Sequence, residues 1–181
     1  KLPELVDTQT LTPSQGFDFA FTAGFGEQRL DSAENIGDFD GDGLDDFLVV
    51  ARGPDFSTDT FNIVRGEAEG LSPDFDLDEA QLIRLSGDLR HVFGTPTGDF
   101  NADGLSDIVL IGSDGLGAYN DMRVIFGTDA VDLKTIDVDG LDGSNGFRIE
   151  GGWALQGIGS AEHGNELFNV GDINNDGIDD L

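Results

Sequence analysis

Asp38-Phe-Asp-Gly-Asp-Gly-Leu-Asp-Asp46 is the stretch that decides the fold, because its pattern returns twice further along the chain. The second copy is Asp99-Phe-Asn-Ala-Asp-Gly-Leu-Ser-Asp107 and the third is Asp172-Ile-Asn-Asn-Asp-Gly-Ile-Asp-Asp180. Each copy has an acid or amide at the first, third and fifth positions, glycine at the sixth, an aliphatic residue at the seventh and aspartate at the ninth. We call these nine-residue segments loop 1, loop 2 and loop 3.

The spacing of oxygen donors in the loops suits a hard cation. Calcium takes six to eight oxygen ligands at about 2.3–2.6 Å, and a tightly wound loop can turn alternate side chains inward while a backbone carbonyl adds a further ligand. The glycine at the sixth position (Gly43, Gly104 or Gly177) is expected at a positive φ angle, which costs a residue without Cβ little. The sequence therefore predicts three Ca²⁺ sites, with these ligands: Asp38, Asp40, Asp42, Leu44 (carbonyl) and Asp46; Asp99, Asn101, Asp103, Leu105 (carbonyl) and Asp107; Asp172, Asn174, Asp176, Ile178 (carbonyl) and Asp180.

Two other interpretations of the loops can be tested on the sequence. An EF-hand needs a bidentate glutamate at the twelfth position and flanking helices, but the twelfth residues here are Val49 and Leu110. The apolar runs Phe47–Ala51 and Ile108–Ile111 predict buried strands after loops 1 and 2. Asp, Asn and Gly also form ordinary turns, yet three copies, two of them followed by the same kind of strand, favour a metal-binding repeat.

Composition limits the classes of function. A chain of 181 residues is long enough for one domain with a real core. Nine basic residues against thirty-seven acidic ones give a formal net charge of −28, which excludes nucleic acid as a partner and opposes direct membrane insertion. There is no cysteine, so no disulfide framework or thiol chemistry is expected. Weak calcium sites fill where the ion is millimolar, which predicts a secreted or cell-surface location.

The predicted strands repeat together with the loops, which begin at residues 38, 99 and 172. After a lead-in over 1–15 and a strand over 16–21, each of two full units combines one loop with four short strands, and a third unit is partial. The expected bounds are about 34–86, 91–150 and 166–181. Four-stranded units at this spacing are typical of β-propeller blades. A solenoid or a sandwich with calcium turns is the alternative, although solenoid coils are usually far shorter.

The units resemble the FG-GAP repeats of integrin α-subunit propellers and of their bacterial secreted relatives. The matching segments are Val170–Leu181, Val124-Ile-Phe-Gly127 and Leu141–Phe147, and the resemblance covers roughly residues 16–181. It implies an all-β fold, a β-propeller usually of seven blades, with calcium held between the first and second strands of some blades and ligands taken up on the opposite face. The family's Gly-Ala-Pro signature is eroded to Ala51-Arg-Gly-Pro54 and Ile111-Gly-Ser113.

About three blades cannot close a ring of four to eight. The expected arrangement is therefore an open propeller that is completed either by a missing part of a longer chain or by other copies of the chain. The chain begins at Lys1 without an initiator Met, so it is expected to be processed or excised.

Catalytic signatures are not found in the sequence. His163 lies near Ser160 and Glu162, but no Gly-x-Ser-x-Gly elbow surrounds that serine, and both His91 and His163 are expected to be loop residues. Carboxylates held on calcium are poor general acids. Trp153 could stack on a sugar or anchor a partner, while filling a gap between units is the simpler role. The stripe Phe17, Phe19 and Phe21 is assigned to the core.

The function expected from the sequence is a non-enzymatic, calcium-stabilised extracellular propeller module for adhesion or protein–protein assembly. Its partner would be a protein or glycan ligand on the cell surface or matrix. The alternatives are the accessory or catalytic propeller of a secreted hydrolase or lyase, and a carbohydrate-binding lectin.

Overall fold

The computed structural model of the chain describes residues 18–19, 29–53, 59–68, 74–75, 82–89, 93–113, 119–150 and 169–180. Every regular element in these ranges is a β-strand. The predicted all-β fold is therefore confirmed for the described part of the chain. No helix among these residues is long and apolar enough to cross a membrane.

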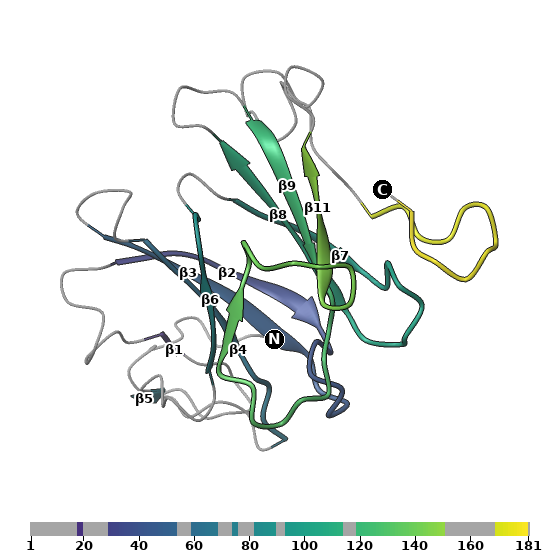
Figure 1. The fold of residues 1–181 in the computed structure, drawn as a ribbon. Coiled ribbons are helices and arrows are strands. Elements are labelled where there is room, and N and C mark those ends of the chain that lie inside the picture. The colour runs from purple at the N-terminus through teal and green to yellow at the C-terminus, as the bar shows by residue number, and fades with distance from the viewer. Residues whose placement is uncertain are drawn as a thin grey trace, which may run out of the picture.

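The first main sheet comes from the first predicted unit, and a fifth strand from later in the chain joins it. Loop 1 connects its first two strands (Figure 1). The first strand begins before residue 34, the expected start of the unit, because backbone pairing with the next strand already starts at Arg29↔Arg52 and keeps polar residues in the strand. The sheet has the order β10-β6-β4-β3-β2, with the antiparallel members β2 (Arg29–Gly37), β3 (Asp46–Arg52), β4 (Thr60–Val64) and β6 (Leu82–Ser86).

The second main sheet repeats the first with an offset of 61 residues. Leu48 pairs with Ile63 in the first sheet, and Val109 pairs with Val124 at the same place in the second. Pro96 lies at the register shift of the first strand, where its missing N–H is not needed for a ladder bond. The sheet has the order β11-β9-β8-β7, with β7 (Phe93–Gly98), β8 (Asp107–Ser113), β9 (Tyr119–Ile125) and β11 (Gly146–Glu150).

The fifth strand of the first sheet was not predicted. Strand β10 (Thr135–Asp137) follows β9 in the chain but pairs in parallel with β6, with Ile136 opposite Leu85. Backbone bonds from Arg84 N to Lys134 O (2.9 Å) and from Val138 N to Ser86 O (2.8 Å) extend the pairing at both ends. The first unit is therefore completed by residues of the second.

Loop 3 follows the second sheet and projects beside it (Figure 1). It is closed by a bridge between Gly171 and Asp180. In the third unit, which was expected to begin near residue 166, Asn169 and Val170 are not in a strand, and Val170 is 53% exposed. Val170 N donates to Asp180 O at 3.1 Å, which extends the closure of the loop by one residue.

The predicted strand over 16–21 is described only at β1 (Asp18–Phe19), which pairs in parallel with β5 (Asp74–Phe75). Several other predictions fall outside the described residues: the lead-in over 1–15, Phe17, Phe21, His91, Trp153, Ser160, Glu162 and His163.

The main hydrophobic core joins the two sheets. Side chains alternate between the faces of a strand, so Ile108 and Leu110 pack into the core shared with the first sheet, while Val109 packs with Met122 and Val124 in a second cluster on the other face. Phe39 of loop 1 is fully buried in the shared core. Within the described residues neither sheet closes on itself, so the propeller remains a prediction.

Candidate metal centres

Loop 1 is wound around the carboxylate of Asp38. Its Oδ1 accepts a hydrogen bond from Gly41 N at 2.8 Å and its Oδ2 accepts one from Gly43 N at 2.9 Å. Asp42 accepts from Leu44 N at 2.8 Å, and Asp40 accepts from Asp42 N at 3.2 Å. These are Asx-type turns, in which a short acid bonds the backbone two or more residues ahead. They explain why the pattern requires an acid or amide at alternate positions.

The same winding brings three of the predicted ligands together. Asp38, Asp40 and Asp42 each place one carboxylate oxygen within 4.8 Å of the others, a group that could hold a metal ion. Burial and the charge of Asp42 raise the pKa of Asp40. Such crowding of like charges is relieved when a cation binds between them. The carbonyls of Leu44, Leu105 and Ile178 remain predicted ligands.

Loops 2 and 3 share most of this hydrogen-bond pattern, but their first aspartate bonds the N–H of the fifth residue, whereas Asp38 bonds that of the fourth. The first aspartate of each, Asp99 or Asp172, accepts from the fifth residue N at 3.0 Å and from the sixth residue N at 2.9 or 2.8 Å. The fifth aspartate, Asp103 or Asp176, accepts from the seventh residue N at 2.8 or 2.9 Å. The amides Asn101 and Asn174 each accept from that fifth residue as well. Three segments of different sequence therefore fold into one loop geometry.

Two positions of each loop are left-handed. The sixth-position glycines all have φ 88°, which confirms the sequence prediction. The fourth position was not predicted: its φ is 76° at Gly41, 60° at Ala102 and 63° at Asn175. Glycine and asparagine adopt this conformation readily, whereas alanine does so at a cost.

Replacing Ala102 by glycine is expected to stabilise the protein by about 0.5–1 kcal/mol, because the left-handed backbone no longer carries a Cβ. The measurement is the free energy of unfolding in urea. The matched variant Gly41→Ala should lose stability, since its added Cβ would also lie 3.0 Å from Leu105 Cδ2. A neutral or destabilising Ala102→Gly would contradict the strain assigned to this position.

The ninth-position aspartates of loops 1 and 2 hold each of these loops to its own sheet. Asp46 is fully buried, and it accepts from Phe39 N (2.9 Å) and Asp40 N (3.2 Å) through Oδ2 and from Gly66 N (2.8 Å) through Oδ1. Asp107 is equally buried and bonds Phe100 N at 2.7 Å and Gly127 N at 2.8 Å. These bonds make the ninth residue a structural bracket, and its ligation of calcium remains a prediction.

Burial has a measurable consequence for these two carboxyls. Desolvation raises the pKa of Asp46 and that of Asp107 to about 6, although the backbone N–H groups that bond each carboxylate act in the opposite direction. A raised pKa means that the charged form is disfavoured in the folded, metal-free chain. A bound cation would favour the charged form.

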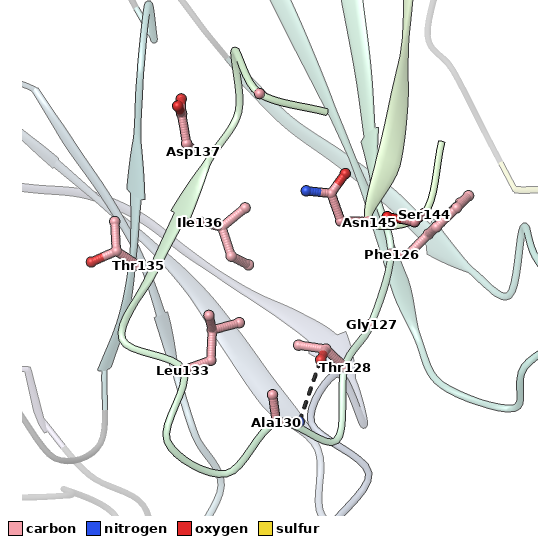
Figure 2. A pocket seen from close by; sticks show the side chains of 11 residues that line it. Phe126, Gly127, Thr128, Ala130, Leu133, Thr135, Ile136, Asp137, Ser144 and Asn145 are labelled. Atoms are coloured by element: carbon pink, nitrogen blue, oxygen red, sulfur yellow. Dashed lines mark hydrogen bonds between the residues drawn. The ribbon is translucent and has the colours of Figure 1, made fainter. Parts of the chain in front are cut away.

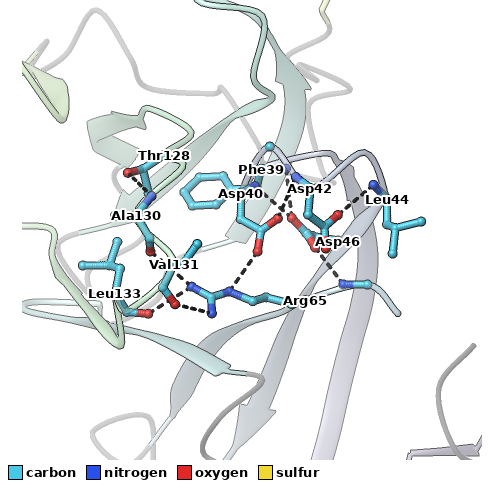
Figure 3. Close-up of polar contacts among 12 residues, drawn as sticks. Phe39, Asp40, Asp42, Leu44, Asp46, Arg65, Thr128, Ala130, Val131 and Leu133 are labelled. Atoms are coloured by element: carbon cyan, nitrogen blue, oxygen red, sulfur yellow. Dashed lines mark hydrogen bonds and ion pairs between the residues drawn. The ribbon is translucent and has the colours of Figure 1, made fainter. Parts of the chain in front are cut away.

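Arg65 was not predicted as a functional residue, and it forms a bridge from loop 1 to the next unit. Its Nε forms an ion pair with Asp40 Oδ2 at 3.0 Å, and its terminal nitrogens donate to the carbonyls of Val131 (3.1 Å) and Leu133 (3.2 Å) (Figure 3). Phe126 occupies the equivalent place in the second unit, 61 residues later. The signal that could have found this bridge is the arginine at a position where the other unit has an aromatic residue.

The arginine also equalises the charge of the loops. The ligand positions of loop 1 carry four carboxylates, and Arg65 brings their formal charge from −4 to −3. Loops 2 and 3 have asparagine at the third position and thus three carboxylates each. The proposed ligand positions of all three loops therefore carry the same formal charge, and Asp45 and Asp179 at the eighth position add further negative charge to loops 1 and 3.

A separate cavity of about 390 Å³ is lined by residues of the second unit, all of them between Phe126 and Asn145 (Figure 2). Its lining is mixed: Leu133 and Ile136 are apolar, whereas Thr128 and Asn145 are polar. It was not predicted from the sequence, and its walls come from four short segments within residues 126–145.

Comparison of the chain with protein-family models, with curated proteins and with solved structures gives no match.

Proposed function

We propose that this chain is a calcium-binding, extracellular β-repeat module that serves adhesion or protein–protein assembly, and that its three ions are structural. The FG-GAP type of β-propeller is the architecture we propose for it. The observation that carries the proposal is the convergence of Asp38, Asp40 and Asp42 in loop 1, together with the hydrogen bond from the sixth-residue N–H to the first aspartate that all three loops share.

Contacts between the loops join successive units, which supports a structural role for the ion. Ser106 N of loop 2 donates to Asp38 O of loop 1 at 2.8 Å, and Asp179 N of loop 3 donates to Asp99 O of loop 2 at 3.0 Å. An ion that holds one loop in its wound conformation therefore also holds in place the backbone carbonyl that accepts a hydrogen bond from the next loop. Assembly and adhesion modules need this kind of rigidity at unit boundaries.

Calcium is expected to raise the melting temperature by several degrees. With dissociation constants of roughly 10⁻⁴–10⁻³ M, millimolar calcium adds about 0.4–1.4 kcal/mol per site. The measurement is thermal unfolding in calcium, in magnesium and in chelator. A midpoint that is unchanged by calcium would overturn the proposed function.

Titration calorimetry of a variant tests the assignment of loop 1. Asp42→Asn keeps an oxygen for the Leu44 N–H but removes one charge, so the number of ions bound in the accessible concentration range should fall from three to two. Asp132→Asn is the matched control, because Asp132 is exposed and lies outside the loops. Equal stoichiometry for the two variants would contradict the assignment.

A further inference from the structure

Successive loops dock on one another by a repeated contact. In the first interface, Ser106 N donates to Asp38 O, and Thr128 N donates to Phe39 O, each at 2.8 Å. A Cβ placed on Gly37 would collide with the Ser106 side chain, so glycine is required there by close approach. The eighth residue of one loop is therefore seated on the first residue of the loop before it.

In the interface between loops 2 and 3, the same two loop positions are in contact, and the docking side chains are more polar. Asp179 N donates to Asp99 O at 3.0 Å, and Asp99 N donates to Asp179 Oδ2 at 3.1 Å. Asn169 Nδ2 donates to the same Oδ2 at 2.9 Å and would lie 2.6 Å from a Cβ on Gly98. An Asn–Asp pair thus forms the part of loop 3 that docks on loop 2.

Loop 1 carries the same Asn–Asp pair. Asn35 Nδ2 donates to Asp45 Oδ2 at 2.9 Å, as Asn169 does to Asp179, and Asn35 Oδ1 accepts from Gly37 N as Asn169 Oδ1 does from Gly171 N. Asn169 and Asp179 are half-buried, whereas Asn35 and Asp45 are exposed. We call Asn35 and Asp45 the docking pair of unit 1.

Loop 3 has an exposed surface that corresponds to the surface of loop 2 on which the Asn169–Asp179 pair docks. Gly171 has φ 69°, close to the 72° of Gly37, but no described atom lies within 4 Å of a Cβ placed on it. Ile173 is 74% exposed, whereas Phe39 at the same loop position is fully buried. We call Gly171, Asp172 and Ile173 the docking surface of loop 3.

We propose that a second copy of this chain seats its docking pair on the docking surface of loop 3, forming a head-to-tail contact. In this contact, Asp45 N of one copy donates to Asp172 O of the other, Asp172 N donates to Asp45 Oδ2, and Ile173 is covered. The two surfaces are different and lie on opposite ends of the repeat, so the interface is heterologous. Such an interface closes into a ring or continues as a filament.

Charge decides the conditions under which this contact forms. Each copy carries a formal charge of −28, and the facing loops are both acidic, so copies repel at low ionic strength. Salt at about 0.5 M shortens the screening length to a few ångströms. The contact relies on backbone amides, so it does not require bound metal, although calcium bound in the loops would reduce the repulsion further.

The test uses sedimentation velocity over a wide concentration range, in 0.5 M NaCl with calcium or with chelator. The full chain is expected to show a mass that rises with concentration. Ile173→Asp blocks the docking surface and Asp45→Arg blocks the docking pair, and both residues are exposed and not among the proposed ligands. Each variant alone should remain monomeric, while an equimolar mixture should form a dimer with twice the mass, through the one intact surface of each.

Asp132→Arg, which makes the same charge change at an exposed site away from both surfaces, should associate like the unchanged chain. Mixed variants that fail to form a dimer would overturn the proposal, as would an unchanged chain that stays monomeric at millimolar concentration. That second result would leave the docking surface to a further unit of the same chain or to a different protein. Because association is measured with and without calcium, its failure is distinguishable from a failure of metal binding.

Discussion

Replacing Asp46 by alanine is expected to lower the free energy of unfolding by about 3 kcal/mol, the largest loss among the aspartates of loop 1. The substitution removes the acceptor of three buried N–H groups, those of Phe39, Asp40 and Gly66. A buried N–H left without a partner costs about 1–3 kcal/mol. Relief of the carboxylate's own desolvation, seen in its raised pKa, offsets part of that sum.

Urea unfolding in chelator measures this loss without a contribution from metal. Asp107→Ala removes the acceptor of two hydrogen bonds instead of three, so it should cost less than Asp46→Ala. The exposed Asp132→Ala should change stability by less than about 0.5 kcal/mol. A loss below 1 kcal/mol for Asp46→Ala would show that the ninth residue is not the bracket of the loop.

Replacing Arg65 by methionine is expected to act in opposite directions on stability and on calcium binding. The metal-free protein should lose about 3 kcal/mol, because Asp40 loses its ion partner and the carbonyls of Val131 and Leu133 lose their donor. Calcium affinity at loop 1 should rise about three- to tenfold, or roughly 0.7–1.4 kcal/mol, because a positive charge near the ion is removed.

Calorimetry and urea unfolding of the same variant separate the two effects. Lys134→Met removes an exposed positive charge without removing a bridge, so it should leave both quantities close to those of the unchanged chain. If Arg65→Met weakened calcium binding at loop 1, the arginine would be required for the loop geometry and would not be a competitor of the ion.

The sequence was sufficient for those features that depend on local chemistry. The left-handed Gly43, Gly104 and Gly177 follow from the tight winding of the pattern, and their φ angles agree. Strands β3 and β8 follow from apolar runs that are buried on both faces, since a residue such as Val49 is as buried as its neighbour Leu48. The convergence of Asp38, Asp40 and Asp42 follows from their alternation in one loop.

Features that depend on distant partners could not be predicted in this way. Strand β10 has only three residues, and two of them are exposed, so its sequence carries no periodic signal; pairing with β6 alone makes it a strand. Arg65 becomes a bridge only because residues 130–133 pass close to loop 1. The left-handed Ala102 is imposed by a loop geometry that its neighbours determine.

Strand β10 couples the unfolding of the two complete units, because it belongs to the second unit in sequence and to the first sheet in the structure. Because residues 135–137 of the second unit form an edge of the first sheet, neither unit can detach while the other keeps its full set of strands. Heating or pulling the chain should therefore produce one cooperative event where a simple row of modules would give two. Proteolytic cleavage between these units would therefore not release an intact first unit. To express the first unit alone, the β10 segment must be included in the chain or added as a peptide.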